Sequence, residues 1–185
     1  MNEQPYIDLY KQTVESIKKH SAACLNTRRD EAFERFTAVG FPTKNEENYL
    51  YCHLMEHLGI DYGLNINRIN IPVDPSNVFK CDVPGIQAYL YFILNDQFYT
   101  GSGATSKPLP DGVVMCSMIE ASERYPELVA TYLGKQTANK KDGFTAFNEA
   151  FAQDGFFFYV PKNVVLETPI QLINILRSDV DLMAN

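Results

Sequence analysis

Two histidines and a glutamate are the residues of this chain whose types and spacing best suit metal chemistry. His53, Glu56 and His57 form the pattern H-x-x-E-H. Histidines four positions apart share one face of a helix, where they can bind zinc while the glutamate acts as general base, so the pattern is typical of a zinc metallohydrolase. Gly59 leaves little helix to support the pattern, and no third protein ligand stands out. A partly exposed helix face without metal is therefore the alternative interpretation.

Four cysteines could supply thiolates to an iron–sulfur cluster. They are Cys24, Cys52, Cys81 and Cys116. Cluster sites usually bring their cysteines close together in sequence, whereas these lie roughly thirty residues apart without any Cys-x-x-Cys pair. We expect free thiols in a reducing compartment, with the cytoplasm as the default, and we expect Cys81 and Cys116 to be small core residues.

The composition argues against two further classes of function. The formal net charge is −7 and the isoelectric point is about 4.9, whereas non-specific nucleic-acid binding needs clustered lysine and arginine. No apolar run approaches the roughly 20 residues of a membrane-spanning helix, and the N-terminus lacks a signal-peptide pattern. We therefore expect neither a nucleic-acid partner nor a membrane partner.

The N-terminal part of the chain has the pattern of helices. Apolar residues at spacings of three and four predict an amphipathic helix over residues 5–20. A second helix is expected to begin near residues 26–27, Asn-Thr, which can cap it, and to end at Gly40. Thr43 and Glu46 have the spacing of a capping box, which predicts a further short helical turn.

The middle of the chain changes to β-type sequence. Residues 89–94 and 97–100 are aromatic and β-branched and flank the turn-forming pair Asn95-Asp96, so they predict a hairpin. A strand is expected over residues 113–118. A helix is expected over residues 121–133, ending at Gly134, with Pro126 near its start or at a kink.

The C-terminal stretch organises the rest of the chain. Asp142 can cap a short helix that places Phe144, Phe147 and Phe151 on one buried face.

The chain then enters strands. Asp154 and Gly155 predict a turn in which the glycine takes a positive φ. The strand 156–160 lacks polar alternation, which indicates cover on both faces or a self-associating edge. Pro161 and Pro169 cannot donate to a strand ladder, so they predict corners between short, stacked strands.

Together these elements predict an α+β fold. We expect an N-terminal helical region at residues 1–75, a mixed α/β middle with a β-hairpin at 76–141, and a helix with strands at 142–185. Because the β architecture begins so near the end of the sequence, we expect the chain to be the N-terminal portion of a longer protein.

Two segments resemble the SufB/SufD family of iron–sulfur cluster assembly proteins. Residues 142–171 are similar to a junction in which D-x-x-x-x-L-N-x-A-F-x-x-D-G leads into Y-V-P-K-N-V-V-x-E-x-P-I, with Phe147 at the usual leucine. Upstream, Arg29, Ala32 and Phe36 followed by GFPTKNEENYLY resemble the SufD-type R-x-x-A-x-x-x-F-x-x-x-G-F-P-T and E-x-W-x-Y elements, with Tyr49 at the usual tryptophan. The resemblance covers most of residues 27–176.

The motif residues are expected to serve structure or an interface. They are Gly40, Phe41, Pro42, Thr43, Tyr49, Tyr51, Asn148, Ala150, Phe151, Asp154, Gly155, Val160, Pro161, Lys162, Asn163 and Pro169.

The resemblance implies a fold and partners beyond this stretch. The C-terminal strands would begin a right-handed parallel β-helix, truncated here, whose edges pair a SufD-type subunit with a SufB-like subunit. A later helical segment would dock the SufC-like ATPase. The resemblance predicts a non-catalytic scaffold subunit of the SUF system; the alternatives are the zinc metallohydrolase and a generic protein-interaction module.

The same resemblance sets the expected cofactors. No cofactor is expected in this portion, and an iron–sulfur cluster, with or without a flavin, is expected only in the assembled complex. An unfinished β edge is an aggregation liability, so we also expect a homodimer formed through that edge.

Overall fold

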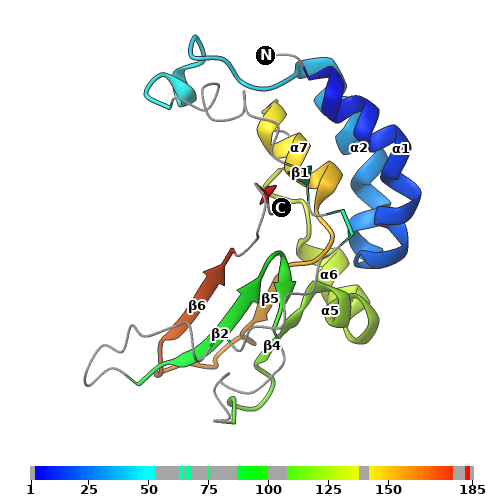
Figure 1. Cartoon of the computed structure of the whole chain (residues 1–185). Helices are drawn as coiled ribbons and strands as arrows, with labels where there is room; N and C mark the ends of the chain where they lie inside the picture. The colour runs from blue at the N-terminus through cyan, green and yellow to red at the C-terminus, as the bar shows by residue number, and fades with distance from the viewer. Residues whose placement is uncertain are drawn as a thin grey trace.

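The computed structural model describes most of the chain (Figure 1). The described residues are 3–52, 63–64, 66–67, 75, 87–99, 108–137, 142–176 and 182–183. The H-x-x-E-H pattern, with His53, Glu56 and His57, lies outside these ranges, as does Cys81. Helices gather on one side of the molecule and most of the strands on the other, which confirms an α+β fold.

The first two helices lie side by side. Helix α1 spans Gln4–His20, as predicted, and α2 spans Ala23–Val39. The expected start of α2 at residues 26–27 is wrong, because the Ala22 carbonyl already accepts hydrogen bonds from the N–H groups of Leu25 and Asn26. Gly40 ends α2 with a φ of 71°, a conformation that suits glycine.

A short 3₁₀ helix, η1, spans Glu47–Tyr49 and confirms the expected helical turn. The capping-box pair sets it up: the Thr43 N–H donates to Glu46 Oε1 at 2.8 Å.

The single helix expected over residues 121–133 is two helices. Helix α5 spans Met118–Arg124 and α6 spans Pro126–Tyr132. Tyr125 separates them with φ −135° and ψ 47°, because the proline ring disfavours helical geometry in the residue before it. Pro126 then occupies the start of α6, where its missing N–H costs nothing.

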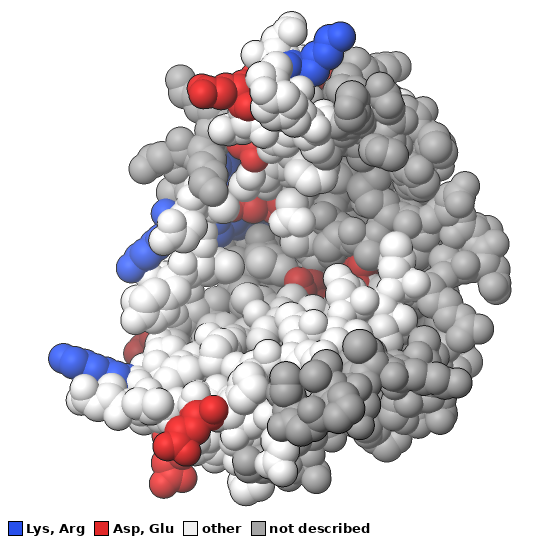
Figure 2. All heavy atoms as spheres, turned by 90° about the vertical axis from the view of Figure 1, so that its left-hand side faces the viewer, with Lys and Arg blue, Asp and Glu red and all other residues white. Residues whose placement is uncertain are grey.

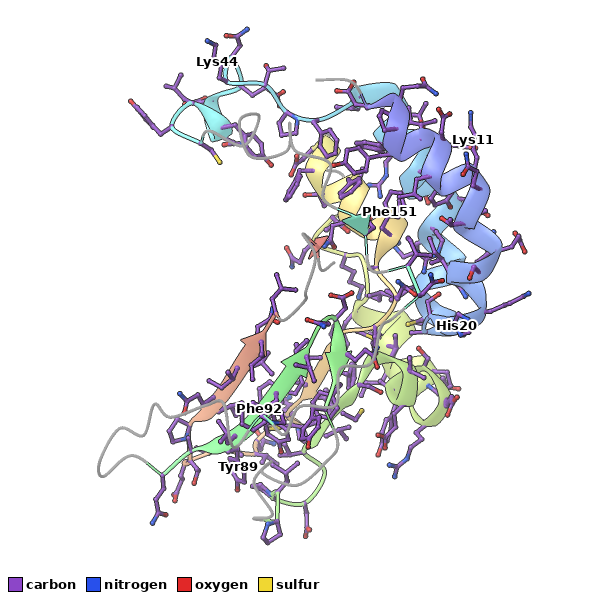
Figure 3. The ribbon with its side chains drawn as sticks, viewed as in Figure 1. Lys11, His20, Lys44, Tyr89, Phe92 and Phe151 are labelled. Atoms are coloured by element: carbon purple, nitrogen blue, oxygen red, sulfur yellow. The ribbon has the colours of Figure 1, made fainter. Side chains whose placement is uncertain are left out.

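Helix α7 spans Gly143–Phe151 and provides the apolar face predicted for it. Phe147 lies at the centre of an aromatic core, with ring centroids 5.3 Å from Phe36, 5.1 Å from Phe41 and 5.2 Å from Tyr6. Figure 3 shows Phe151 on the side of α7 that faces α1 and α2, where its ring lies edge-on to a tyrosine of α1. The core of the helical part is therefore built from aromatic rings of α1, α2 and α7.

The predicted hairpin is confirmed. Strand β2 spans Tyr89–Leu94 and pairs antiparallel with β3, Gln97–Phe98. Asn95 and Asp96 both have positive φ, 44° and 72°, as a tight two-residue hairpin turn requires. Strand β6, Ile170–Ile175, pairs in parallel with β2 on its other side.

Two smaller pairings complete the described strands. Strand β4, Val114–Ser117, pairs antiparallel with β5, Phe156–Tyr159. Strand β1, Gly63–Leu64, pairs in parallel with β7, Leu182–Met183.

Aromatic rings connect the β4–β5 pair to the three-stranded sheet. The ring of Phe156 stacks against Phe98 at 5.8 Å and lies 5.7 Å from Tyr91. Strand β5 therefore packs against β2 and β3 through its side chains. The division of the chain into three regions stays a prediction.

Replacing Phe147 tests the aromatic core. Phe147→Ala should lower the free energy of unfolding by about 3–5 kcal/mol, because it leaves a cavity among rings that cannot collapse together. Phe147→Leu should cost less than about 1.5 kcal/mol, since leucine is closer in volume. Urea denaturation measures both values. The exposed Val39→Ala should change stability by less than about 0.5 kcal/mol, and an equal loss in Val39→Ala and Phe147→Ala would contradict this core.

Candidate functional site: the helix-to-sheet junction

A buried arginine joins three elements at the point where α7 ends. Arg29 is 0% exposed. Its Nη1 donates to the Ala150 carbonyl at 2.6 Å and its Nη2 to the Ala152 carbonyl at 2.7 Å. Its Nη2 also donates to Ser21 Oγ and its Nε to Asn26 Oδ1. The guanidinium therefore makes four hydrogen bonds without contacting a carboxylate.

These partners explain how a positive charge is tolerated in the interior. The carbonyls of Ala150 and Ala152 lie at the end of α7, where a helix leaves its last carbonyls unsatisfied and carries partial negative charge. Burial lowers the pKa of Arg29, but a guanidinium remains protonated in proteins. Arg29 thus supplies both the charge and the donors that this helix end lacks.

The other end of α7 is fixed by close backbone contact. A Cβ atom added to Gly143 would overlap the Gly40 carbonyl oxygen, so only glycine permits this approach. Nearby, Asp142 Oδ1 accepts hydrogen bonds from Tyr49 Oη at 2.9 Å and from the Phe144 N–H at 3.0 Å. Helices α2 and α7 are therefore antiparallel and are tied together at both ends.

Two pKa shifts follow from the contact between Asp142 and Tyr49. Burial alone would raise the pKa of Asp142, but hydrogen bonds from Thr145, Tyr49 and the backbone lower it overall. Burial, with the hydrogen bond to Asp142, raises the pKa of Tyr49 to about 12. At neutral pH the tyrosine is thus the donor and the carboxylate the acceptor.

Glu149 forms a second charged group on α7. Its carboxylate makes an ion pair with Arg35 through Oε2, accepts a hydrogen bond from Thr137 Oγ1 through Oε1, and lies 4.0 Å from Arg28 Nη2. The Glu149 side chain is only 17% exposed. Glu149 thus contacts two arginines of α2 and the segment that follows α6.

A cavity of about 420 Å³ opens beside this ion pair. Its wall is largely apolar and comes from α2, α5, α6, α7 and β5. The lining residues are Leu25, Arg28, Met118, Val129, Tyr132, Leu133, Gly134, Gln136, Thr137, Asn148, Glu149, Ala152, Phe156, Phe157 and Phe158.

The structure brings the upstream motif residues together with α7. Phe41 and Pro42 are buried, and Phe41 packs on the rings of α7. Tyr49 reaches Asp142, whereas Tyr51 is 90% exposed. Thr43 is exposed apart from its capping hydrogen bond.

The downstream motif residues form the exit from α7. Ala150 and Phe151 are buried, while Asn148 is exposed at the cavity. The expected positive φ at Gly155 is wrong, because Gly155 is not among the residues with positive φ. Instead, Asp154 Oδ1 accepts from the N–H of Ile119 and the Gly155 carbonyl accepts from the N–H of Met118, so this pair holds the start of α5.

The last motif residues contact different elements. Pro161 lies against Gly112, where an added Cβ would come within 2.9 Å of the proline ring. Lys162 and Asn163 are exposed, and Asn163 has a φ of 66°. The Pro169 carbonyl accepts from the N–H at the start of β2.

Val160, which is partly buried, directly follows β5. This group therefore surrounds the β5–β6 connection instead of joining the junction.

The described residues do not form a recognisable metal-binding group. No group of three or more histidine, cysteine, aspartate or glutamate side chains there could hold a metal ion. Burial raises the pKa of Cys116 to about 11 and also raises the pKa of Cys24, whose Sγ accepts a hydrogen bond from Ser122. Both are therefore protonated thiols, and Cys116 is a core residue, as predicted. Cys52 is exposed.

The charges on one face of the molecule are dispersed. In Figure 2 the lysine and arginine side chains of the described residues do not merge into one basic surface. None of the described helices has the length and apolar character needed to cross a membrane.

Sequence reasoning missed the arginines of α2 as organising residues. Arg29 shares a helix face with Ala32 and Phe36 at spacings of three and seven, and an arginine on an otherwise apolar stripe is a usable signal for a buried, paired charge. The cavity residue Arg28 and the ion-pair residue Arg35 carry no such signal. Nor does Gly143, whose role depends on a backbone that is distant in sequence.

These features define a structural α+β unit whose motif residues mainly secure one junction. A model of the SufBD protein N-terminal region matches residues 1–172 of this chain. The chain therefore belongs to the SufBD family of iron–sulfur cluster assembly proteins.

Curated relatives agree with this family. A SufBD family protein of Synechocystis is 35% identical over 82 residues, covering 44% of this chain and 17% of the relative. A second Synechocystis SufBD protein is 25% identical over 149 residues, covering 80% and 32%. The iron–sulfur cluster assembly protein SufD of Bacillus subtilis is 34% identical over 76 residues, covering 40% and 17%. The chain thus spans no more than about a third of these relatives.

Substituting Arg29 tests the junction. Arg29→Ala should lower the free energy of unfolding by about 3 kcal/mol or more, because two buried carbonyls lose their donors at about 1–3 kcal/mol each. Arg29→Lys should recover only part of this, since an ammonium group lacks the planar fork that reaches both carbonyls. Denaturant titration measures both, with the exposed Arg124→Ala as control. Full stability in Arg29→Ala would refute the assigned role.

The lowered pKa of Asp142 predicts a pH dependence. Its folded-state pKa lies below the ordinary value of about 3.9, so the unfolded chain binds the proton more readily and stability falls as the pH drops through and below that value. Asp142→Asn should lose less stability between pH 5 and pH 3 than the parent chain, as measured by denaturant unfolding at each pH. The exposed Asp111→Asn is the control, and an unchanged slope in Asp142→Asn would contradict the assignment.

Proposed function

We propose that this chain is part of a SufD-like, non-catalytic scaffold subunit of the SUF system. It would act through protein contacts with SufB-like and SufC-like partners. The observation that carries this proposal is the use of the family motif: Arg29, Asp142 and Asp154 are engaged with backbone groups that set the junction. Structural use of polar motif residues fits a subunit that presents surfaces.

The relatives support the pathway. Their names describe iron–sulfur cluster assembly, and one of them is a SufD protein. An iron–sulfur cluster, with or without a flavin, would then belong to the assembled complex, and this portion itself would hold no cofactor. The cytoplasm, favoured by the unpaired cysteines, is the proposed compartment.

We also propose that the strands begin a right-handed parallel β-helix. Two parallel pairings support this, β2 with β6 and β1 with β7. Along β2–β6 the register runs unbroken from Tyr89 opposite Ile170 to Leu94 opposite Ile175, as in stacked coils. β6 has one neighbour among the described strands, so its other edge can receive a further strand, a SufB-like partner or a second copy of the chain.

Co-purification tests the scaffold role. The full-length product of the gene, carrying an affinity tag, should retain SufB-like and SufC-like proteins from its own cells. It should show no hydrolase activity by itself, while ATP hydrolysis should follow the SufC-like ATPase. A tagged full-length protein with Lys11→Ala, an exposed substitution on α1, controls for handling of the sample.

Two results would overturn the proposal. Isolation without either partner would favour a generic interaction module. Stoichiometric zinc that is lost in His57→Ala, together with hydrolase activity, would favour the metallohydrolase.

A further inference from the structure

We propose that the cavity at the helix-to-sheet junction binds a small organic anion with an aromatic body. The proposal rests on three features of the cavity: its volume, its aromatic wall and the balance of charge at its edge. It goes beyond the scaffold function and does not depend on it, because it concerns this chain without partners.

The size and wall of the cavity suit an aromatic ligand. A volume of about 420 Å³ falls in the range of small-molecule sites, which are mostly apolar with a few polar groups. Tyr132 and the phenylalanines of β5 contribute four aromatic rings to the wall. Phe158 is 42% exposed and stacks on Phe156. An exposed ring beside a cavity offers a flat surface on which another ring can stack.

The charge at the edge favours an anion. Glu149 is held by Arg35 and Thr137, so its negative charge already has a close partner. Arg28 lies 4.0 Å from the same carboxylate. Two arginines therefore face one glutamate, which leaves a net charge of about +1 beside an apolar wall, where an anionic group interacts more strongly than in water.

The backbone makes room for Arg28 at this position. Gly134 has a φ of 74°, and a Cβ atom on it would overlap the Arg28 guanidinium. In the part of the chain that the structure describes, Glu149 is the residue that forms an ion pair with Arg28. A planar guanidinium with free donors can hold a carboxylate or sulfonate through two hydrogen bonds.

Binding of 8-anilinonaphthalene-1-sulfonate to the purified 185-residue chain tests the proposal. Fluorescence titration should show saturable binding of one probe per chain. Arg28→Gln should weaken this binding about tenfold or more, because a hydrogen bond to a charged group is lost. The neutral analogue N-phenyl-1-naphthylamine should bind Arg28→Gln and the parent chain equally.

Two further variants locate the probe. Lys11→Gln removes the same charge from an exposed position of α1 that does not line the cavity and should leave the affinity unchanged. Phe158→Ala removes an exposed ring of the wall and should weaken both probes several-fold. Circular dichroism confirms that each variant is folded.

Several outcomes would overturn the proposal. These are non-saturable binding, unchanged affinity in the folded Arg28→Gln variant, or an equal loss in Lys11→Gln. Competition experiments distinguish an aromatic ligand from an aliphatic one. Displacement of the probe by 1-naphthoate at a lower concentration than by decanoate supports an aromatic acid. The reverse order refutes it. Co-purification with SUF partners can succeed or fail whatever the probe does, so the two proposals fail separately.

Discussion

The rest of the described structure depends on the hydrogen bonds of one buried guanidinium. Helix α1 ends near Ser21 and α7 ends near Ala152, so two helix C-termini, each with unsatisfied carbonyls, converge on the first half of α2. Arg29 donates to two carbonyls at the end of α7 and to the Ser21 hydroxyl, which itself donates to the Ile17 carbonyl of α1. A carboxylate partner is unnecessary, because the partial negative charge of these helix ends offsets part of the cost of burying the cation. The direct bond from the Ala22 N–H to the Gln153 carbonyl, at 2.8 Å, secures the same point.

Fixing both ends of α7 sets the direction in which the chain enters the strands. The glycine contact at one end and Arg29 at the other leave α7 little freedom to slide along α2. The chain then passes directly into β5, where the Asp154–Gly155 pair binds the start of α5 and the ring of Phe156 meets β2 and β3. The segment from α7 into β5 thus joins the helical core to the sheets.

The sequence predicts a helix, strand or turn correctly where residues close together in the sequence determine it. The hairpin at Asn95–Asp96, the end of α2 at Gly40 and the apolar face of α7 all follow from turn chemistry or periodicity. Two predicted helix boundaries were wrong because other interactions compete with the local pattern. Helix α2 begins earlier than predicted because the Ala22 carbonyl already accepts the first hydrogen bonds. Pro126 divides into two helices a segment that periodicity alone predicts as one. Of the candidate site, the motif residues could be predicted, but Gly143 could not, because its contact lies about a hundred residues away along the chain. The ion pairs of Glu149 likewise could not be predicted from the sequence, because the fold alone brings its arginine partners close.

The internal roles of the motif residues narrow the surface that can meet a partner. A side chain whose hydrogen bonds already hold the backbone would have to leave the junction unpaired to contact another protein, at the cost of buried polar groups without partners. Asp142 and Asp154 are therefore excluded as partner-contacting residues by their hydrogen bonds, and Phe41 and Phe151 are excluded by their burial. Near the motif residues, strongly exposed apolar side chains include Tyr51 at 90% and Leu50 at 54% in the η1 region, and Val165 at 78% in the β5–β6 connection beside exposed Lys162. Exposed aromatic and aliphatic side chains are favoured at the centres of protein interfaces. We therefore propose that a scaffold built on this chain contacts its partners through these two segments as well as through the open edge of β6, while the junction holds the relative positions of the two segments.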